Sequence, residues 1–531
     1  MPASSDPRYH PIIYVRGFAA TEGEIEDTVA DPYMGFNIGS TKARVAWTGK
    51  VRRFYFESPL VRLMSDHKYE DVLVEGDDLV AAEAVNHPVP YRSIIIYRYY
   101  DEASKDFGDG KGTPPIERFA SGLSDLILKL RDRVVANPKN KVTETDFKVY
   151  LVAHSMGGLV CRAFLQNPRL GTPAARAAVD KVFTYATPHN GIDMRIVRNI
   201  PGWLSFGDIN NFNRDRMADY LDVPKGDDVS ILKDFPPERI FNLIGTNPRD
   251  YGAGGGISAW AAGDASDGLV RIENAATHGI NAQGKDVGSP RAFVHRSHSG
   301  HYGIVNSEEG YQNLTRFFFG SLRVDGILDI DEITLPAEVQ RASDAGKNVE
   351  ASYQFEVVAS IRGCQWEMTR REVREHSAIF RKFRSLFPTK VGGHWQPDRS
   401  QSPHLFSIFL DPRKSVVAGK KSVSFALDLK VLVPDYEVAG TLFLKRHYEG
   451  GYIYHEMIII EAFQDEAEPG GWKIKHGTQD NDPGKAGTVA ETKALVDFQG
   501  KTTGLYCQIP IVTNSTPRIR GVLRIEARKW I

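Results

Sequence analysis

The abrupt change from strand to helix around Ser155 constrains the fold more than any other feature of the sequence. It lies in "KVYLVAHSMGGLVCRAFL", residues 148–165. Residues 148–152 are rich in β-branched and aromatic side chains, which predicts a buried strand, and residues 159–165 have helical apolar spacing. The serine between them must adopt a strained conformation with positive φ, which is tolerable when the residues two positions away are small. Here those residues are Ala153 and Gly157.

Such a turn gives Ser155 the properties of a nucleophile. It lifts the hydroxyl clear of the sheet and directs the amide of Met156, at the positive end of the new helix, toward the same space. The usual pattern is G-x-S-x-G, and alanine at position 153 adds one methyl group. The alternative is that Ser155 only caps the helix. A cap requires neither small flanking residues nor a strand that runs directly into it, so we favour the nucleophile.

Short apolar runs without clean alternation recur through the first 320 residues and indicate strands buried on both faces. Helical spacing at 116–135 and 308–322 separates some of them, so we expect a mainly parallel α/β sheet. The predicted strands are 11–18, 93–100, 148–155, 181–188, 239–246 and 291–297.

The pattern changes near residue 335. Residues 422–433 and 518–528 alternate apolar and polar side chains, as strands with one solvated face do. We therefore expect an antiparallel, sandwich-like β domain after the α/β domain. The predicted boundaries are 1–328 for an α/β-hydrolase catalytic domain with insertions at 19–92 and 190–238, 329–348 for a linker, and 349–531 for a β-rich accessory domain.

Composition excludes several classes of protein. The chain has 531 residues, and its 66 basic and 67 acidic residues give a net charge of −1, so no nucleic-acid partner is expected. Three widely separated cysteines fit a reduced compartment. Neither a signal peptide nor an apolar run long enough to span a membrane is visible, which favours the cytoplasm, with export by a route without a cleaved signal as the alternative.

A serine nucleophile needs a base oriented by a carboxylate, and in this kind of sheet both follow the serine in the chain. Asp267 in "GDASDGLVRIENA" is the best acid by order and position, with Asp264 and Asp250 as alternatives. An Asp-Gly pair is also a turn signal, so Asp267 could instead be an ordinary loop residue.

The base is chosen from "VHRSHSGHYGIVNSEEG", which holds His295, His298 and His301. We favour His301, which follows a glycine and precedes the final helix, and keep His298 as the alternative base. Spacing by three residues also invites a metal site, but zinc signatures place such pairs on helices with a nearby Glu or Cys ligand, so we expect no metal.

The second oxyanion donor should come from the loop after the first core strand. In "IIYVRGFAAT", Gly17 lets the backbone turn and the amide of Phe18 is the natural donor. Phe18 could equally be a core residue without a catalytic part.

Together these pieces resemble the α/β-hydrolase superfamily, in its lipase and carboxylesterase branch, which includes bacterial true lipases and lipase-like GPI inositol deacylases. "AHSMGG", "ATPHNG", "SDGLV" and "GHYGIVNS" are similar to segments of these enzymes in the same order, and the resemblance covers residues 8–322. It implies a Ser-Asp-His triad that needs no cofactor. Relatives usually have histidine at the position of Arg16, which could place a positive charge near an anionic head group.

The long insertion at 190–238 contains the apolar residues Trp203, Leu204 and Phe206, which are candidates to line the substrate site. The insertions could form a mobile lid or simply pack on the domain. We predict a serine hydrolase that cleaves carboxylic esters through an acyl-enzyme. Lipid esters, including phospholipids, are favoured, and peripheral contact with a membrane surface is possible. The alternatives are a non-catalytic binding or delivery protein that uses the β domain, and an amidase or thioesterase with the same triad.

Overall fold

The computed structural model describes residues 8–530 except 20–21, 47, 73–88, 109, 111–112, 193–209, 227, 250–264, 301, 415–421, 440–444, 465–471, 479–486 and 497–499. The chain divides into two compact units. Unit 1 comprises residues 1–291 and 295–318, and unit 2 comprises residues 292–294 and 319–531. Each unit is described by itself.

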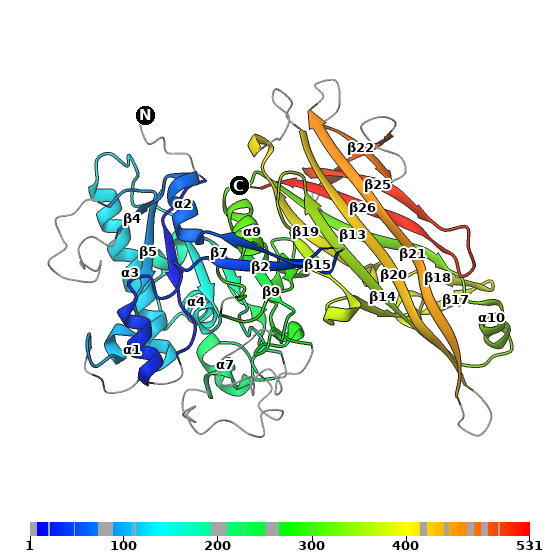
Figure 1. Cartoon of the computed structure of the whole chain (residues 1–531), viewed down its shortest axis with the longest axis horizontal. Helices are drawn as coiled ribbons and strands as arrows, with labels where there is room; N and C mark the ends of the chain where they lie inside the picture. The colour runs from blue at the N-terminus through cyan, green and yellow to red at the C-terminus, as the bar shows by residue number, and fades with distance from the viewer. Residues whose placement is uncertain are drawn as a thin grey trace. The chain divides into compact units, whose positions relative to one another are not determined.

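A seven-stranded sheet in the order β12-β9-β7-β6-β1-β5-β4 organises unit 1 (Figure 1). The pairings from β9 through to β4 are parallel. All six predicted strands are present, because their apolar runs are buried on both faces; β1, for example, has no exposed residue. The strands are β1 (Ile12–Val15), β4 (Glu70–Asp71), β5 (Ser93–Tyr97), β6 (Val149–His154), β7 (Val179–Tyr185), β9 (Ile240–Gly245) and β12 (Arg291–Val294).

Helices accompany this sheet, as the alternation in the sequence predicts. The longest, α3 (Ile116–Ala136), buries its apolar stripe, whereas α4 (Met156–Gln166) is buried all round. The others are α1 (Glu22–Ala30), α2 (Pro59–His67), α5 (Pro173–Ala178), α7 (Arg214–Leu221) and α9 (Glu308–Phe319). The parallel sheet with helices confirms the predicted α/β fold class.

The predicted insertions contain additional structure. The first includes an antiparallel hairpin of β2 (Ser40–Val45) and β3 (Val51–Phe56). The second includes α7 and β8 (Ile231–Leu232), which joins β10 (His278–Ile280) and β11 (Asp286–Gly288) in a three-stranded sheet. Trp203, Leu204 and Phe206 lie outside the described residues, so their role in lining the substrate site stays a prediction.

Unit 2 is built from antiparallel sheets, as expected from its alternating pattern. One has the order β19-β13-β26-β25-β24, and the other has the order β15-β14-β20-β21-β22-β23, with β16 also paired to β14. Their inward side chains form one apolar core. The strands of the first sheet are β13 (Leu322–Ile333), β19 (His404–Leu410), β24 (Thr492–Val496), β25 (Thr502–Val512) and β26 (Ile519–Lys529). Those of the second are β14 (Val349–Ile361), β15 (Thr369–Arg371), β16 (Ile379–Lys382), β20 (Ser422–Ala439), β21 (Lys445–Gln464), β22 (Trp472–Thr478) and β23 (Thr488–Ala490).

The residues expected to join the domains are structured. The strand β13 begins at Leu322, inside the range assigned to the hydrolase domain, and pairs with β26 along most of its length. Helix α10 (Ala337–Asp344) occupies most of the remaining predicted linker. Unit 2 also contains the short helix α11 (Phe383–Leu386) and the hairpin β17 (Thr389–Val391) with β18 (His394–Gln396). The structure therefore begins unit 2 at residue 319 rather than at 349.

Candidate active site

Ser155 lies between β6 and α4 with the strained backbone that the sequence predicts. Its φ is 51° and its ψ is −123°, and its amide donates to the carbonyl of Tyr185 at the end of β7, at 2.9 Å. A non-glycine residue with these angles is rare and persists only where the surrounding structure holds it. Both strand ends lie at the carboxyl edge of the sheet, where ligands of parallel sheets bind.

The small residue after Ser155 is required by close packing. A Cβ atom at Gly157 would lie 2.3 Å from the carbonyl oxygen of Val15 and 2.5 Å from that of Arg16. The first turn of α4 therefore lies directly against the end of β1. Ala153, on the other side of the serine, is fully buried, and its methyl group is accommodated.

His298 bridges Ser155 and Asp267. Its Nε2 lies 3.0 Å from Ser155 Oγ, and its Nδ1 lies 2.9 Å from Asp267 Oδ2. All three side chains are buried, so water competes little for these contacts. The order nucleophile, base and carboxylate is the arrangement of a serine hydrolase triad.

The preferred base of the sequence analysis gives way to its alternative. The position beside Ser155 is occupied by His298, and His301 lies outside the described residues. The backbone explains the choice, because the amide of His298 donates to the carbonyl of Asp267 at 2.9 Å. This bond holds the two loops together one residue after Ser297, which pairs with Gly303 in an isolated bridge.

Asp267 is fixed by its own loop. Its Oδ1 accepts the amides of Leu269 and Val270 at 3.0 and 2.7 Å, which leaves Oδ2 directed at the imidazole. Close packing holds its backbone, since a Cβ at Gly245 would lie 2.7 Å from Asp267 Cβ. The alternatives Asp250 and Asp264 lie outside the described residues.

The two predicted oxyanion donors flank the serine. Met156 is the first residue of α4, so its amide has no acceptor within the helix. Gly17 precedes Phe18 and lies close to the nucleophile: a Cβ there would be 2.9 Å from Ser155 Cβ. The ring of Phe18 packs edge-to-face on Phe212 with centroids 5.9 Å apart, so an aromatic pair stands beside the candidate oxyanion hole.

His154 was not singled out from the sequence, although it lies inside the elbow. Its Nε2 is 3.0 Å from the carbonyl oxygen of His298, and the two rings lie 4.9 Å apart. Burial, with the nearby His298 and Arg16, lowers the pKa of His154 well below its usual value. The neutral ring therefore donates to the His298 carbonyl and supports the loop. A histidine directly before the nucleophile was the available signal.

Arg16 is directed toward the backbone of its own unit. Its Nη1 donates to the carbonyl of Met34, and its own carbonyl accepts the hydroxyl of Tyr99 at 2.6 Å. Its Nε is buried and has no hydrogen-bond partner within the described part of the chain. Contact with an anionic head group stays a prediction.

The histidine of "ATPHNG" serves the scaffold. Its carbonyl accepts the buried guanidinium of Arg162 at 2.9 Å, and its ring contacts Thr184 Oγ1 at 3.2 Å. Arg162 also donates to the carbonyls of Val229 and Ile231. This loop therefore joins α4 to the second insertion, and His189 itself is buried away from solvent.

Residues 120–219 match the family model of the PGAP1-like alpha/beta domain. The matched segment contains α3, the strand β6, the turn at Ser155, α4 and β7. Unit 1 is an α/β-hydrolase of the lipase-like branch. The resemblance expected from the sequence is therefore confirmed, and the fold supports ester hydrolysis in general. None of the curated proteins matches the chain.

Two solved structures are similar to the chain at low identity. The mature form of Bacillus licheniformis lipase BlEst2 is 14% identical, with a TM-score of 0.28, over 60% of this chain and 94% of the lipase. Phospholipase PlaB from Legionella pneumophila is 11% identical, with a TM-score of 0.26, over 83% of this chain and 90% of the phospholipase.

Two further surveys concern the described residues alone. No group of three or more His, Cys, Asp or Glu side chains there is placed to hold a metal ion. No helix among them is long and apolar enough to cross a membrane.

Proposed function

We propose that the protein is a serine hydrolase that cleaves carboxylic esters through an acyl-enzyme. The observation that carries this proposal is the contact of His298 with both Ser155 Oγ and Asp267 Oδ2, at 3.0 and 2.9 Å. A hydroxyl becomes an effective nucleophile only when a base within hydrogen-bond reach takes its proton, and a carboxylate must hold that base in the right tautomer.

In the proposed mechanism, Ser155 Oγ attacks the ester carbonyl carbon while its proton passes to His298 Nε2. Asp267 accepts the Nδ1 proton in a hydrogen bond and orients the imidazolium. The amides of Met156 and Phe18 donate to the oxyanion of the tetrahedral intermediate. The intermediate then collapses, and His298 returns the proton to the leaving alcohol. A water molecule, deprotonated by the same histidine, attacks the acyl-enzyme and releases the acid.

Lipid esters are the proposed substrate class. The edge-to-face pair of Phe18 and Phe212 supplies an apolar wall beside the predicted oxyanion donors, and Phe212 itself is buried. Aromatic surface of this kind favours an acyl chain over a polar acyl group. In the sequence, the apolar residues of the second insertion add to this preference.

The test is hydrolysis of p-nitrophenyl esters with two to sixteen carbons, beside a phospholipid. We expect the wild type to hydrolyse them and Ser155→Ala to lose about 10⁴- to 10⁶-fold in kcat. A maximum at long acyl chains supports lipid esters, and a maximum at two to four carbons contradicts them. If the wild type hydrolyses no ester and a fluorophosphonate does not label Ser155, the proposal of a serine hydrolase is wrong.

A further inference from the structure

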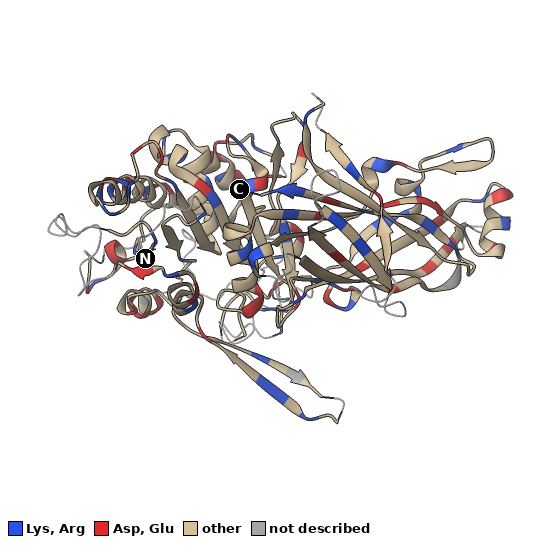
Figure 2. Ribbon diagram, turned by 90° about the horizontal axis from the view of Figure 1, so that it is seen from above, with Lys and Arg blue, Asp and Glu red and all other residues tan. Residues whose placement is uncertain are grey.

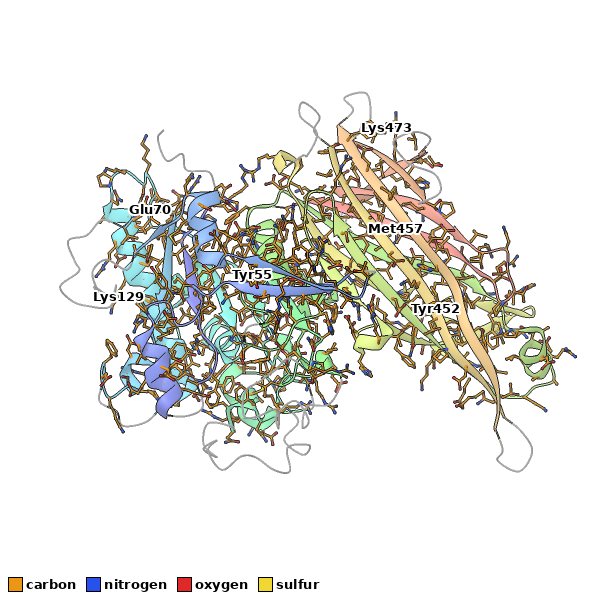
Figure 3. The ribbon with its side chains drawn as sticks, viewed as in Figure 1. Tyr55, Glu70, Lys129, Tyr452, Met457 and Lys473 are labelled. Atoms are coloured by element: carbon orange, nitrogen blue, oxygen red, sulfur yellow. The ribbon has the colours of Figure 1, made fainter. Side chains whose placement is uncertain are left out.

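The hairpin of β2 and β3 stands away from the body of unit 1 (Figure 2). The residues of β3 from Val51 to Tyr55 are all exposed, and Tyr55 is 73% exposed. Its side chain is labelled on the ribbon in Figure 3. A two-stranded ribbon with solvent on both faces is only marginally stable by itself. This ribbon therefore gains little stability from its own packing.

The ribbon carries charge of one sign. Residues 40–56 contain Lys42, Arg44, Lys50, Arg52 and Arg53 and no acidic residue, although the whole chain has a net charge of −1. Figure 2 shows basic and no acidic positions along it. Arg52 and Arg53 are exposed, and neither has an ion-pair partner within the described residues. The strand register also sets Arg44 opposite Arg52, where like charges repel.

Large apolar side chains lie among these charges. Val45 and Val51 are opposite one another in the register, at the distal end of the ribbon, and are 70% and 56% exposed. Opposite residues of an antiparallel pair share a face, so Val45, Val51, Arg53 and Tyr55 lie on one face of the hairpin. Exposed valine and tyrosine side chains next to cations suit the boundary between lipid head groups and acyl chains.

We propose that this hairpin is a docking site for an anionic lipid surface. Its unpaired arginines attract the head groups, and its valines and Tyr55 enter the boundary region. Charge complementarity selects an anionic partner, and the exposed apolar face distinguishes a lipid surface from a soluble anion. Lipid is chosen as the occupant because the proposal rests on the proposed function, in which the ester is a lipid.

The base of the hairpin is tied to the segment that carries His298. Arg296, which is buried, donates from Nη1 to the carbonyl of Thr41 in β2 at 2.8 Å. Its Nε and Nη2 donate to Glu309 Oε2 at 3.1 and 2.9 Å, and Glu309 also pairs with Lys42. A lipid surface bound by the ribbon is thus tethered, through Arg296, to the candidate catalytic loop.

The test measures binding of the full chain to vesicles of ether-linked phosphatidylcholine, with and without ether-linked phosphatidylglycerol, by co-sedimentation. Ether lipids contain no cleavable ester, so binding is read without turnover, and the result is independent of whether Ser155 is a nucleophile. The variant is K50Q/R52Q/R53Q. The matched control, K129Q/K139Q/K141Q, removes three exposed charges elsewhere on unit 1. Circular dichroism and the melting temperature establish that both variants fold.

We expect the wild type and the control to bind the anionic vesicles more tightly than the neutral ones, with binding weakened by salt. Each basic residue near an anionic surface contributes roughly fivefold, so the hairpin variant should bind about 100-fold more weakly. Tyr55→Ser should weaken the binding that persists at high salt. Equal binding by the two triple variants, or no binding by the wild type, overturns the proposal. So does a change of oligomeric state in the hairpin variant without a change in vesicle binding, which would identify a second copy of the chain as the partner.

Discussion

Ser155 can approach its partners because the residues around it are small. Gly17 is the most sensitive of these, since a Cβ atom there would lie 2.9 Å from both Ser155 Cβ and His154 Nδ1. Real Cβ atoms do not approach other atoms so closely, so either the nucleophile or the loop that bears Phe18 must shift. Position 17 therefore controls the relation between the nucleophile and a candidate oxyanion donor.

We predict that Gly17→Ala lowers kcat toward p-nitrophenyl esters about 100-fold, because a displacement near 1 Å at the reacting atoms has an effect of that size. The folded state should persist, as judged by circular dichroism. Gly226→Ala is the matched control, since a Cβ there meets no atom within 4 Å. Equal kcat values for the two variants would show that the close contact at Gly17 has no catalytic consequence.

At this scale the sequence predicts the nucleophile and the carboxylate but not the base. Ser155 has a local signature, because strand, small residues and helix must coincide at it. The histidines at 295, 298 and 301 share one strand end, and spacing alone does not rank them. The decisive contact, from the amide of His298 to the carbonyl of Asp267, joins segments 31 residues apart in the chain. Tertiary contacts of that kind leave no local pattern.

Among the elements, α9 does more than cover the sheet. Its residue Glu309 is buried and accepts Arg296, which lies two residues before His298. Burial by itself would raise the pKa of Glu309, but the charges of Arg296 and Lys42 outweigh burial, and the pKa is lowered. The ion pair therefore persists at neutral pH and fixes the start of the loop that carries the candidate base.

We predict that Glu309→Gln destabilises unit 1 by about 3–5 kcal/mol, because it leaves the buried Arg296 without its counter-charge. Urea unfolding measures this free energy. The matched control is Glu273→Gln, which breaks the exposed pair of Arg271 and Glu273 at 3.3 Å and should cost less than about 1 kcal/mol. A similar loss of stability in both variants would contradict the role assigned to the buried pair.

The elements that the sequence predicts best are those with one dominant environment. The strands β1, β6 and β7 are buried on both faces, and β20 alternates between a buried and a more open face, so each carries a clear pattern. The hairpin β2–β3 is exposed on both faces and gives no such pattern. Similarly, β13 begins unit 2 although its acidic residues read as a linker. Arg524 and Arg528 of β26 pair with its Asp329 and Asp325, which the sequence alone cannot show.

Over the whole molecule, the two units respond to acid through different groups. Burial lowers the pKa of His10 in unit 1 to about 4, and it lowers the pKa values of His154 and His189 well below their usual range. Between pH 6.5 and 4 the unfolded chain takes up a proton that folded His10 refuses, so the stability of unit 1 falls as pH falls through this window. For His10 the loss is about 3 kcal/mol.

In unit 2, Asp325 behaves oppositely. Burial alone would raise its pKa, but the charge of Arg323 and the hydrogen bond from His404 outweigh burial and lower it. The stability that Asp325 contributes is present above its unfolded pKa, near 3.9, and is lost only below it. His476, which is half-buried, is the one described histidine of unit 2 whose pKa is also lowered.

We therefore predict that unit 1 loses stability between pH 7.5 and 5 and that unit 2 changes less. Calorimetry at the two pH values, with limited proteolysis to identify the unit that unfolds first, measures this difference. His10→Gln should reduce the pH dependence of the first transition. The prediction fails if unit 2 is the more acid-labile over this range, or if the first transition of the wild type does not move.

The central claim is that Ser155, His298 and Asp267 act as one catalytic unit, and comparison of His298→Ala with His301→Ala tests it most directly. The quantity to measure is kcat/KM for p-nitrophenyl butyrate, beside the rate of fluorophosphonate labelling of Ser155. Loss of a triad histidine costs about 10⁴- to 10⁶-fold. We predict that loss, together with loss of labelling, for His298→Ala, and a change of less than about tenfold for His301→Ala. The reverse result, with His298→Ala active and His301→Ala silent, would contradict the account.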